Sequence, residues 1–221
     1  MDLLNFHTHR PAVLGERVVR SLDLCSECGL FDITSSQNEL FSVGIHPWSV
    51  CQAVDLNASL ERLQNLLALP EVCMLGECGL DKCCRTEFDL QLLFFRAQVE
   101  LAESMGKPVV IHCVRAYDVL LSVRRASTFR QPWIIHGFRG KVALMEQLLR
   151  MGFYFSFGPY FQEDTLRVCP EDRFFIETDD FADSLLSVYQ HVALVRNMSV
   201  ETLIELQQER FSFLCLNRQF L

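Results

Sequence analysis

The chain has 221 residues and half of them are apolar, which is enough for one domain with a large core. A formal net charge of −8 argues against a broad electrostatic grip on duplex DNA, although nucleotides and short nucleic-acid ends stay open as partners. The apolar runs are of strand length, so we expect no transmembrane helix, and the first residues do not resemble a signal peptide. We therefore expect a single domain over residues 1–221, located in the cytoplasm and without a membrane partner.

Ten cysteines are scattered along the chain. In a chain of this length they favour the reduced thiols of a cytosolic protein over a disulfide framework. Cys25 and Cys28 form a lone C-x-x-C motif, and the adjacent pair Cys83-Cys84 is a poor second half for a zinc site. We therefore expect thiols in loops and in the core.

Strand-like and helix-like segments alternate from one end of the chain to the other. The expected strands are 3–6, 17–22, 40–45, 72–76, 108–111, 133–135, 153–157 and 173–176. The expected helices are 56–69, 87–105, 116–125, 141–151, 184–196 and one that opens at 199. Little helical periodicity separates the second and third strands. The pattern predicts an α/β fold, a TIM-type (β/α)8 barrel abbreviated in its first units.

Side chains that bind metals follow several of these strands. His7 and His9 lie on one side of the first strand because strand side chains alternate. Glu77 ends the fourth strand, and His112 and His136 end the fifth and sixth. Taken alone, His7 and His9 would be ordinary polar residues at a barrel mouth in about one case in four. Glu77 alone could be a salt-bridged carboxylate, and His112 or His136 alone is as consistent with a hydrogen-bonded histidine at the mouth as with a ligand. Together they predict a divalent-metal site at the carboxyl ends of the strands.

The eighth strand is followed by several carboxylates. Glu177, Asp179, Asp180 and Asp183 are all candidates for a metal ligand. Asp179 is preferred because it ends the run on the same side of the strand as Phe175 and Glu177.

Six motifs in their order along the chain resemble the TatD-like metal-dependent hydrolases of the amidohydrolase superfamily. They are His7-Thr8-His9, Gly44-Ile45-His46-Pro47, Gly76-Glu77-Cys78-Gly79-Leu80-Asp81, Val110-Ile111-His112, Ile135-His136-Gly137-Phe138-Arg139-Gly140 and Glu177-Thr178-Asp179. Gln91, two turns before Gln98, also fits. The resemblance covers essentially the whole chain. It implies a (β/α)8-type barrel, a divalent-metal site and hydrolysis of phosphodiesters in DNA.

The resemblance also implies roles for individual residues. One metal ion would be held by the side chains of His7, His9, Glu77 and Asp179. A second would be held by Glu77, His112 and His136, with Glu77 bridging the two ions. Asp179 and Glu77 would be the catalytic carboxylates, and His46 and Arg139 would face the substrate. The mixed nitrogen and oxygen ligands suit Zn, Mn, Mg, Co or Ni, as one or two ions.

Other cations lie just after strand ends. Lys82, Arg115 and Arg139 are candidate contacts for phosphate, although each is more simply a solvated surface charge. Trp48, which follows the Gly-Ile-His-Pro motif, is a candidate for stacking on a base.

The chain departs from the family pattern at two loops. Cys113-Val114-Arg115 replaces the usual Ser-Arg-Asp, and Asp180-Phe181-Ala182-Asp183 is acidic where the family often carries Ala-Pro and a basic loop. The chain is also shorter than a typical member. The main prediction is a metal-dependent phosphoesterase, a TatD-like deoxyribonuclease acting on DNA ends or nucleotide-like phosphoesters. Two alternatives stay open: an enzyme that cleaves a small ester, lactone or amide, and a non-catalytic metal-binding scaffold.

Overall fold

The structure is a computed structural model that describes residues 2–25, 33, 36–53, 55–182 and 184–215. Its strands are β1 (Leu3–Thr8), β2 (Glu16–Asp23), β3 (Glu39–Gly44), β4 (Val72–Asp81), β5 (Val109–Val114), β6 (Trp133–Ile135), β7 (Tyr154–Phe157) and β8 (Phe174–Ile176). Its α-helices are α1 (Leu56–Leu67), α2 (Phe88–Ser104), α3 (Tyr117–Ala126), α4 (Val142–Arg150), α5 (Glu163–Val168), α6 (Leu185–Arg196) and α7 (Val200–Cys215). Two 3₁₀ turns are η2 (Val50–Gln52) and η3 (Glu171–Arg173).

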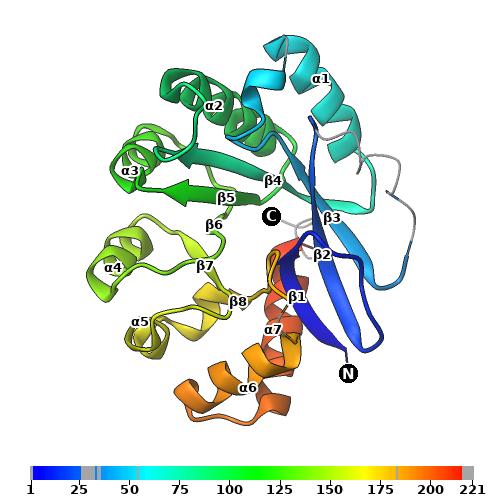
Figure 1. Ribbon diagram of the computed structural model, residues 1–221, viewed down its shortest axis with the longest axis vertical. Helices are drawn as coiled ribbons and strands as arrows, with labels where there is room; N and C mark the ends of the chain where they lie inside the picture. The colour runs from blue at the N-terminus through cyan, green and yellow to red at the C-terminus, as the bar shows by residue number, and fades with distance from the viewer. Residues whose placement is uncertain (1, 26–32, 34–35, 54, 183, 216–221) are drawn as a thin grey trace. The chain divides into compact units, whose positions relative to one another are not determined.

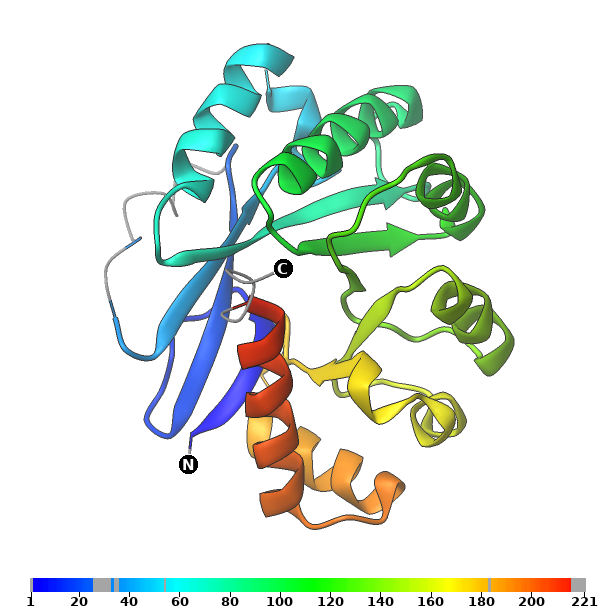
Figure 2. The same cartoon turned by 180° about the vertical axis from the view of Figure 1, so that it is seen from behind.

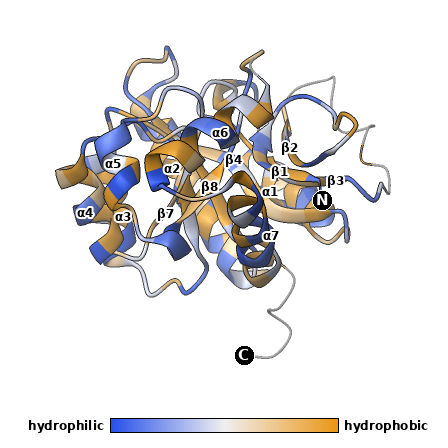
Figure 3. Cartoon of the chain, turned by 90° about the horizontal axis from the view of Figure 1, so that it is seen from below, coloured by the Kyte–Doolittle hydropathy of each residue, from blue (hydrophilic) through white to orange (hydrophobic). Residues whose placement is uncertain are grey.

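The residues group into two compact units. Unit 1 comprises Met1–Arg20, Gln37–Glu39 and Ile135–Leu221, and unit 2 comprises Ser21–Ser36 and Leu40–Ile134. In both, the strands are apolar and buried, and Figure 3 shows helices with hydrophobic and hydrophilic stretches. In α4, for example, Met145 and Leu148 are buried while Arg150 is exposed. Buried strands flanked by amphipathic helices are typical of α/β folds.

Unit 1 is built around the junction of its first and last strands. β1 pairs in parallel with β2, β7 pairs in parallel with β8, and an isolated bridge joins Thr8 to Asp179. The rings of Phe6 and Phe175 stack at 4.2 Å beneath that bridge. Helices α6 and α7 contact β1 (Figure 1). The ends of β1 and β8 are therefore fixed side by side, although they are far apart in sequence.

Unit 2 is a parallel arrangement of β3, β4 and β5. β4 pairs with β5 on one side and with β3 on the other. Helix α2 packs on β4 and α1 lies beside α2, as Figure 2 also shows, while α3 packs on β5. Gly79 pairs with His112, and a Cβ atom at Gly79 would lie 1.9 Å from the His112 carbonyl oxygen. Only glycine allows this close approach of β4 to β5.

Two buried glutamines of α2 hold the ends of β3 and β4. The Gln98 side chain accepts a hydrogen bond from Ile45 N at 2.8 Å and donates one to Ile45 O at 3.1 Å. The Gln91 side chain accepts from Asp81 N at 2.8 Å and donates to Asp81 O at 3.1 Å. These side chains take the place of strand partners for backbone groups that are shielded from water.

The predicted elements agree with the structure except at some strand ends and at one short helix. Strand β1 runs on to Thr8, beyond the expected end at Phe6. Strands β4 and β5 run on to Asp81 and Val114, beyond the expected ends at Gly76 and Ile111, because these two extensions pair with each other. Helix α5 was not predicted, since its six residues are too few to show a helical period. The predicted C-x-x-C pair is only partly covered, because Cys28 lies outside the described residues.

The described cysteines include both buried and exposed thiols. Cys78, Cys113 and Cys169 are buried, and burial raises the pKa of the Cys113 and Cys169 thiols to about 12. Thiols with such high pKa values are inert packing groups. No helix among the described residues is long and apolar enough to cross a membrane.

We expect Gln98→Leu to lower the free energy of unfolding by about 2–4 kcal/mol, because both polar groups of Ile45 would lose their partner while staying buried. Urea denaturation followed by circular dichroism measures this loss. The matched control is Gln64→Leu on the exposed face of α1, which should change the stability little. Equal stabilities of the two variants would contradict the proposed role of Gln98.

Candidate metal and substrate site

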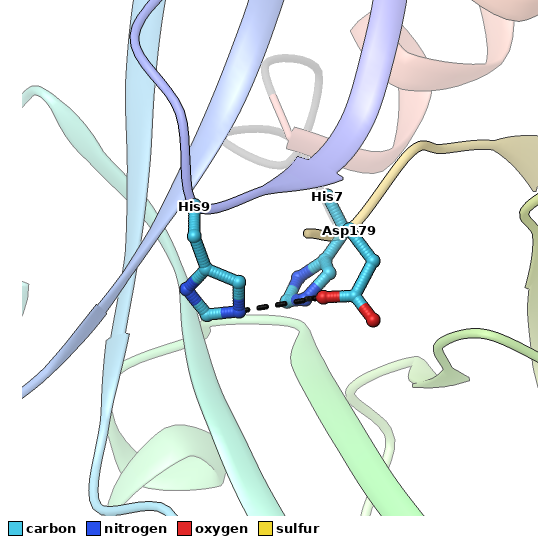
Figure 4. A group of neighbouring side chains, drawn as sticks. All are labelled: His7, His9 and Asp179. Carbon is cyan, nitrogen blue, oxygen red and sulfur yellow. Dashed lines mark ion pairs between the residues drawn. The ribbon is translucent and has the colours of Figure 1, made fainter. Parts of the chain in front are cut away.

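In unit 1, His7, His9 and Asp179 form one group of potential metal ligands. Their ligand atoms lie within 4.8 Å of one another. The Nε2 atoms of His7 and His9 lie 3.7 and 3.4 Å from the same oxygen, Asp179 Oδ1 (Figure 4). The His7 side chain is fully buried, whereas His9 and Asp179 are 37% and 26% exposed. One side of this group is therefore open to a ligand from solvent.

The backbone at the β1–β8 junction positions this group. Asp179 N donates to His7 O at 3.0 Å, and Thr8 Oγ1 donates to Asp179 O at 3.0 Å. The buried Asn5 side chain donates to Thr178 Oγ1 at 2.8 Å and accepts from Thr178 N at 3.0 Å. Asp179 has a φ of 52°, in the left-handed region. This conformation is uncommon for a residue other than glycine, and local strain of this kind concentrates at functional sites.

The charge of Asp179 is strongly favoured. Burial raises the pKa of this carboxyl, but the hydrogen bonds of His7 and His9 and the field of His136 outweigh burial and hold the pKa far below its usual value. Asp179 is therefore ionised at any physiological pH.

His136 and Glu177 extend the group in unit 1. The His136 ring lies 4.4 Å from the His7 ring, and its Nδ1 is 3.6 Å from Glu177 Oε1. Glu177 is fully buried and accepts a short hydrogen bond from Ser156 Oγ. Glu177 therefore lies behind His136 rather than at the open side, where Asp179 is placed.

In unit 2, Glu77, His112 and His46 form a second group of potential ligands. Glu77 Oε1 lies 2.9 Å from His112 Nδ1 and 3.2 Å from His46 Nε2. The His46 Nδ1 atom accepts a hydrogen bond from Trp48 N at 3.2 Å. That bond leaves the proton of a neutral His46 on Nε2, where it is donated to Glu77.

Asp81 and Trp48 complete the arrangement in unit 2. Asp81 Oδ2 lies 3.2 Å from His112 Nε2 and accepts from Trp48 Nε1 at 2.7 Å, while Oδ1 accepts from Cys83 N at 2.7 Å. Burial raises the pKa of Asp81, but these hydrogen bonds lower it further than burial raises it. Asp81 is therefore an ionised carboxylate that is fixed by several donors.

The predicted phosphate contacts have different surroundings. Lys82 Nζ forms an ion pair with Asp118 at 3.0 Å. Arg115 follows β5, its side chain is exposed, and its backbone φ of 53° lies in the left-handed region. Arg139 is exposed, and its guanidinium lies over the rings of Tyr160 and Phe181 at 5.4 and 5.6 Å. Of the three, Arg139 is held by aromatic packing rather than by a carboxylate.

The donors in both units fit a divalent metal. Imidazole nitrogens and carboxylate oxygens are the ligands of Zn and related ions, and within each group the potential ligand atoms lie within 4.8 Å of one another. The ligand roles of individual residues stay predictions.

Asp81 had no predicted role of its own, and Glu177 was predicted only as a rival of Asp179 for a metal. Both had a usable signal in strand alternation. Asp81 is four residues after Glu77, and Glu177 two residues before Asp179, so each pair shares one side of its strand. Because the fourth strand was expected to end at Gly76, Asp81 was not placed on it.

Comparisons with known proteins identify the family. A family model described as TatD related DNase matches residues 29–214. The chain is 31% identical over 155 residues to the 3'-5' ssDNA/RNA exonuclease TatD of Rahnella sp. (strain Y9602), covering 62% of this chain and 56% of that protein. It is 30% identical over 148 residues to the uncharacterized metal-dependent hydrolase YabD of Bacillus subtilis (strain 168), covering 62% of this chain and 57% of that protein. The aligned part is thus less than two thirds of the length of these relatives.

A solved structure shows the fold. The chain is similar to the TatD homologue YjjV of Escherichia coli K12, with a TM-score of 0.80 and 18% identity over 96% of this chain and 97% of that one. The likeness confirms the predicted α/β fold of the (β/α)8-barrel type. Because the family model covers most of the residues, the chain belongs to the TatD-related DNase family.

Proposed function

We propose that the protein is a divalent-metal-dependent phosphoesterase that cleaves phosphodiester bonds at single-stranded nucleic-acid ends. The observation that carries the proposal is the convergence of His7, His9 and Asp179 at the open end of the β1–β8 junction. The family and the exonuclease name of a relative support the substrate class. The proposed ligands are those of the motifs, namely His7, His9, Glu77, His112, His136 and Asp179.

The proposed chemistry is hydrolysis by a water molecule that the site orients. A divalent ion, when bound, lowers the pKa of a coordinated water and offsets charge on the phosphoryl oxygens. Asp179, which is partly exposed, accepts a hydrogen bond from the attacking water and then its proton, while the water oxygen bonds to phosphorus and the bond from phosphorus to the leaving oxygen breaks. The leaving oxygen takes a proton from solvent. His46, whose Nε2–H points to Glu77, and Arg139 face the substrate in this proposal. Glu77 is the proposed bridging carboxylate.

A cytoplasmic location is part of the proposal. Exposed Cys51 and Cys83 are thiols, as are buried Cys78 and Cys113, and such thiols suit a reducing compartment. Cell fractionation measures the location directly.

The acidic loop after Asp179 favours a second candidate substrate. Asp180 is exposed next to the site, and the whole chain carries a net charge of −8, so a small neutral ester, lactone or amide would meet less repulsion than a polynucleotide. Turnover of single-stranded DNA, a dinucleotide, a nitrophenyl ester and a cyclic amide with Zn, Mn or Mg distinguishes the two. Metal uptake without turnover of any of them would favour a scaffold.

We expect Glu77→Gln to reduce metal-dependent cleavage of an end-labelled single-stranded oligonucleotide by about 100-fold or more, because an amide is a much weaker ligand than a carboxylate. Initial rates and metal content by mass spectrometry are measured together. Glu100→Gln, the same change on the exposed face of α2, is the control and should behave as wild type. Full metal-dependent turnover by Glu77→Gln would overturn the proposed mechanism.

We expect Arg139→Ala to raise KM for the oligonucleotide about tenfold with little change in metal content, because one charged hydrogen bond to phosphate is lost. Steady-state kinetics of the oligonucleotide and of a neutral nitrophenyl ester separate charge recognition from general damage. Arg150→Ala at the exposed end of α4 is the matched control. An equal loss with both substrates would show that Arg139 does not recognise phosphate.

A further inference from the structure

The ring of His112 lies between two carboxylates of the same strand. Glu77, Gly79 and Asp81 share one side of β4, and His112 of β5 pairs with Gly79 in the middle. The two ring nitrogens consequently meet different groups: Nδ1 is 2.9 Å from Glu77 Oε1 and Nε2 is 3.2 Å from Asp81 Oδ2. A side chain at Gly79 would clash with the His112 backbone, so glycine allows the close pairing that brings His112 between the two carboxylates.

A neutral imidazole carries one proton, so its two nitrogens cannot both donate. Ionised carboxylates accept hydrogen bonds and do not donate them. The proton of a neutral His112 therefore belongs either to Nδ1, which faces Glu77, or to Nε2, which faces Asp81. The surroundings of Asp81 decide between these two tautomers.

Asp81 is held in place by groups outside the proposed ligands. Its side chain accepts from Trp48 Nε1 and from Cys83 N, both at 2.7 Å, and its own backbone is held on both sides by Gln91. The Asp81 side chain is 4% exposed. A fixed, buried acceptor at Nε2 favours the tautomer with Nε2–H, which leaves the Nδ1 lone pair directed toward Glu77.

Trp48 fixes the acceptor from the solvent side. The residue is 61% exposed, yet its indole N–H points inward to Asp81 and its backbone N–H bonds to His46. Its ring lies 5.7 Å from the His112 ring, nearly perpendicular to it. The structure thus has a continuous chain of hydrogen bonds from Trp48 through Asp81 to His112.

We propose that Asp81 is a positioning residue that fixes the Nε2–H tautomer and ring orientation of His112, and that Trp48 holds Asp81 in place for this purpose. Nδ1 of His112 then binds the metal together with Glu77, a consequence that rests on the proposed function. Carboxylates that accept the second N–H of a metal-binding histidine fix its tautomer and raise its basicity, and their loss typically weakens metal binding. Neither Asp81 nor Trp48 contacts the reacting atoms in this arrangement.

The first test reads the tautomer without metal or activity. Long-range proton–nitrogen NMR spectra of the metal-free, full-length protein labelled with ¹⁵N-histidine should show His112 as the Nε2–H tautomer, assigned by its loss in His112→Gln. In Asp81→Asn this preference should be lost or reduced. Asp118→Asn, an exposed aspartate that pairs with Lys82, is the control and should leave the spectrum unchanged. A wild-type Nε2–H tautomer that persists in Asp81→Asn overturns the proposal.

The second test measures metal affinity. Titration calorimetry with Zn²⁺ and Mn²⁺ should show Kd weakened about 10–100-fold in Asp81→Asn, and by a smaller factor in Trp48→Phe. Trp48→Phe keeps an aromatic ring and changes an exposed position, so it keeps the proposal testable if Asp81→Asn fails to fold. Unchanged affinity in both folded variants overturns the positioning role. If the wild-type protein takes up no metal, the proposed function is wrong. The NMR spectra then still test whether Asp81 fixes the tautomer of His112.

Discussion

Hydrogen bonds from buried amide side chains to strand-end backbones are the constraint on which this site depends. Where a strand ends, some of its backbone N–H and C=O groups have no partner on the neighbouring strand. Leaving such groups buried without a hydrogen bond lowers the free energy of unfolding. Gln98 satisfies Ile45 just before His46, and Gln91 satisfies Asp81. Asn5 plays the same part for Thr178, next to Asp179. Each of these polar side chains therefore links the packing of the core to the direction of a functional residue.

The same constraint explains why the two ligand groups can be dense in charge. Carboxylates and imidazoles that lie close together need donors and acceptors in fixed positions. Without them, the charged side chains would turn to solvent or lose their charge by a change of protonation. Asp179 Oδ1 lies 3.7 and 3.4 Å from the Nε2 atoms of two histidines, and Asp81 accepts hydrogen bonds from Trp48 and Cys83. Ionised oxygens result in both places. The two units solve the problem with different partners, but with the same combination of rigid backbone and converging donors.

Most of the strands, and the positions of the histidines at their ends, could be predicted from the sequence, because alternation and apolar runs are local signals. Alternation places Glu177 and Asp179 on the same side, so Asp179 could be preferred only because it ends the run. In the structure Glu177 is fully buried beside His136, whereas Asp179 is partly exposed. What could not be predicted depends on contacts distant in sequence. The length of β4 is set by its pairing with β5, and the role of Asp81 follows from a ring that arrives from that other strand.

The cations show how the surroundings determine which charges remain available to a substrate. Lys82 is close to the end of β4, but its ammonium is matched by Asp118, so part of its field is cancelled locally. Arg139 instead packs on Tyr160 and Phe181, and aromatic packing orients a guanidinium without neutralising it. Phe181 belongs to the loop that begins at Asp179, so this packing also sets Arg139 beside the group of unit 1. In an acidic chain, a guanidinium oriented in this way is the structural basis for the phosphate contact proposed for Arg139.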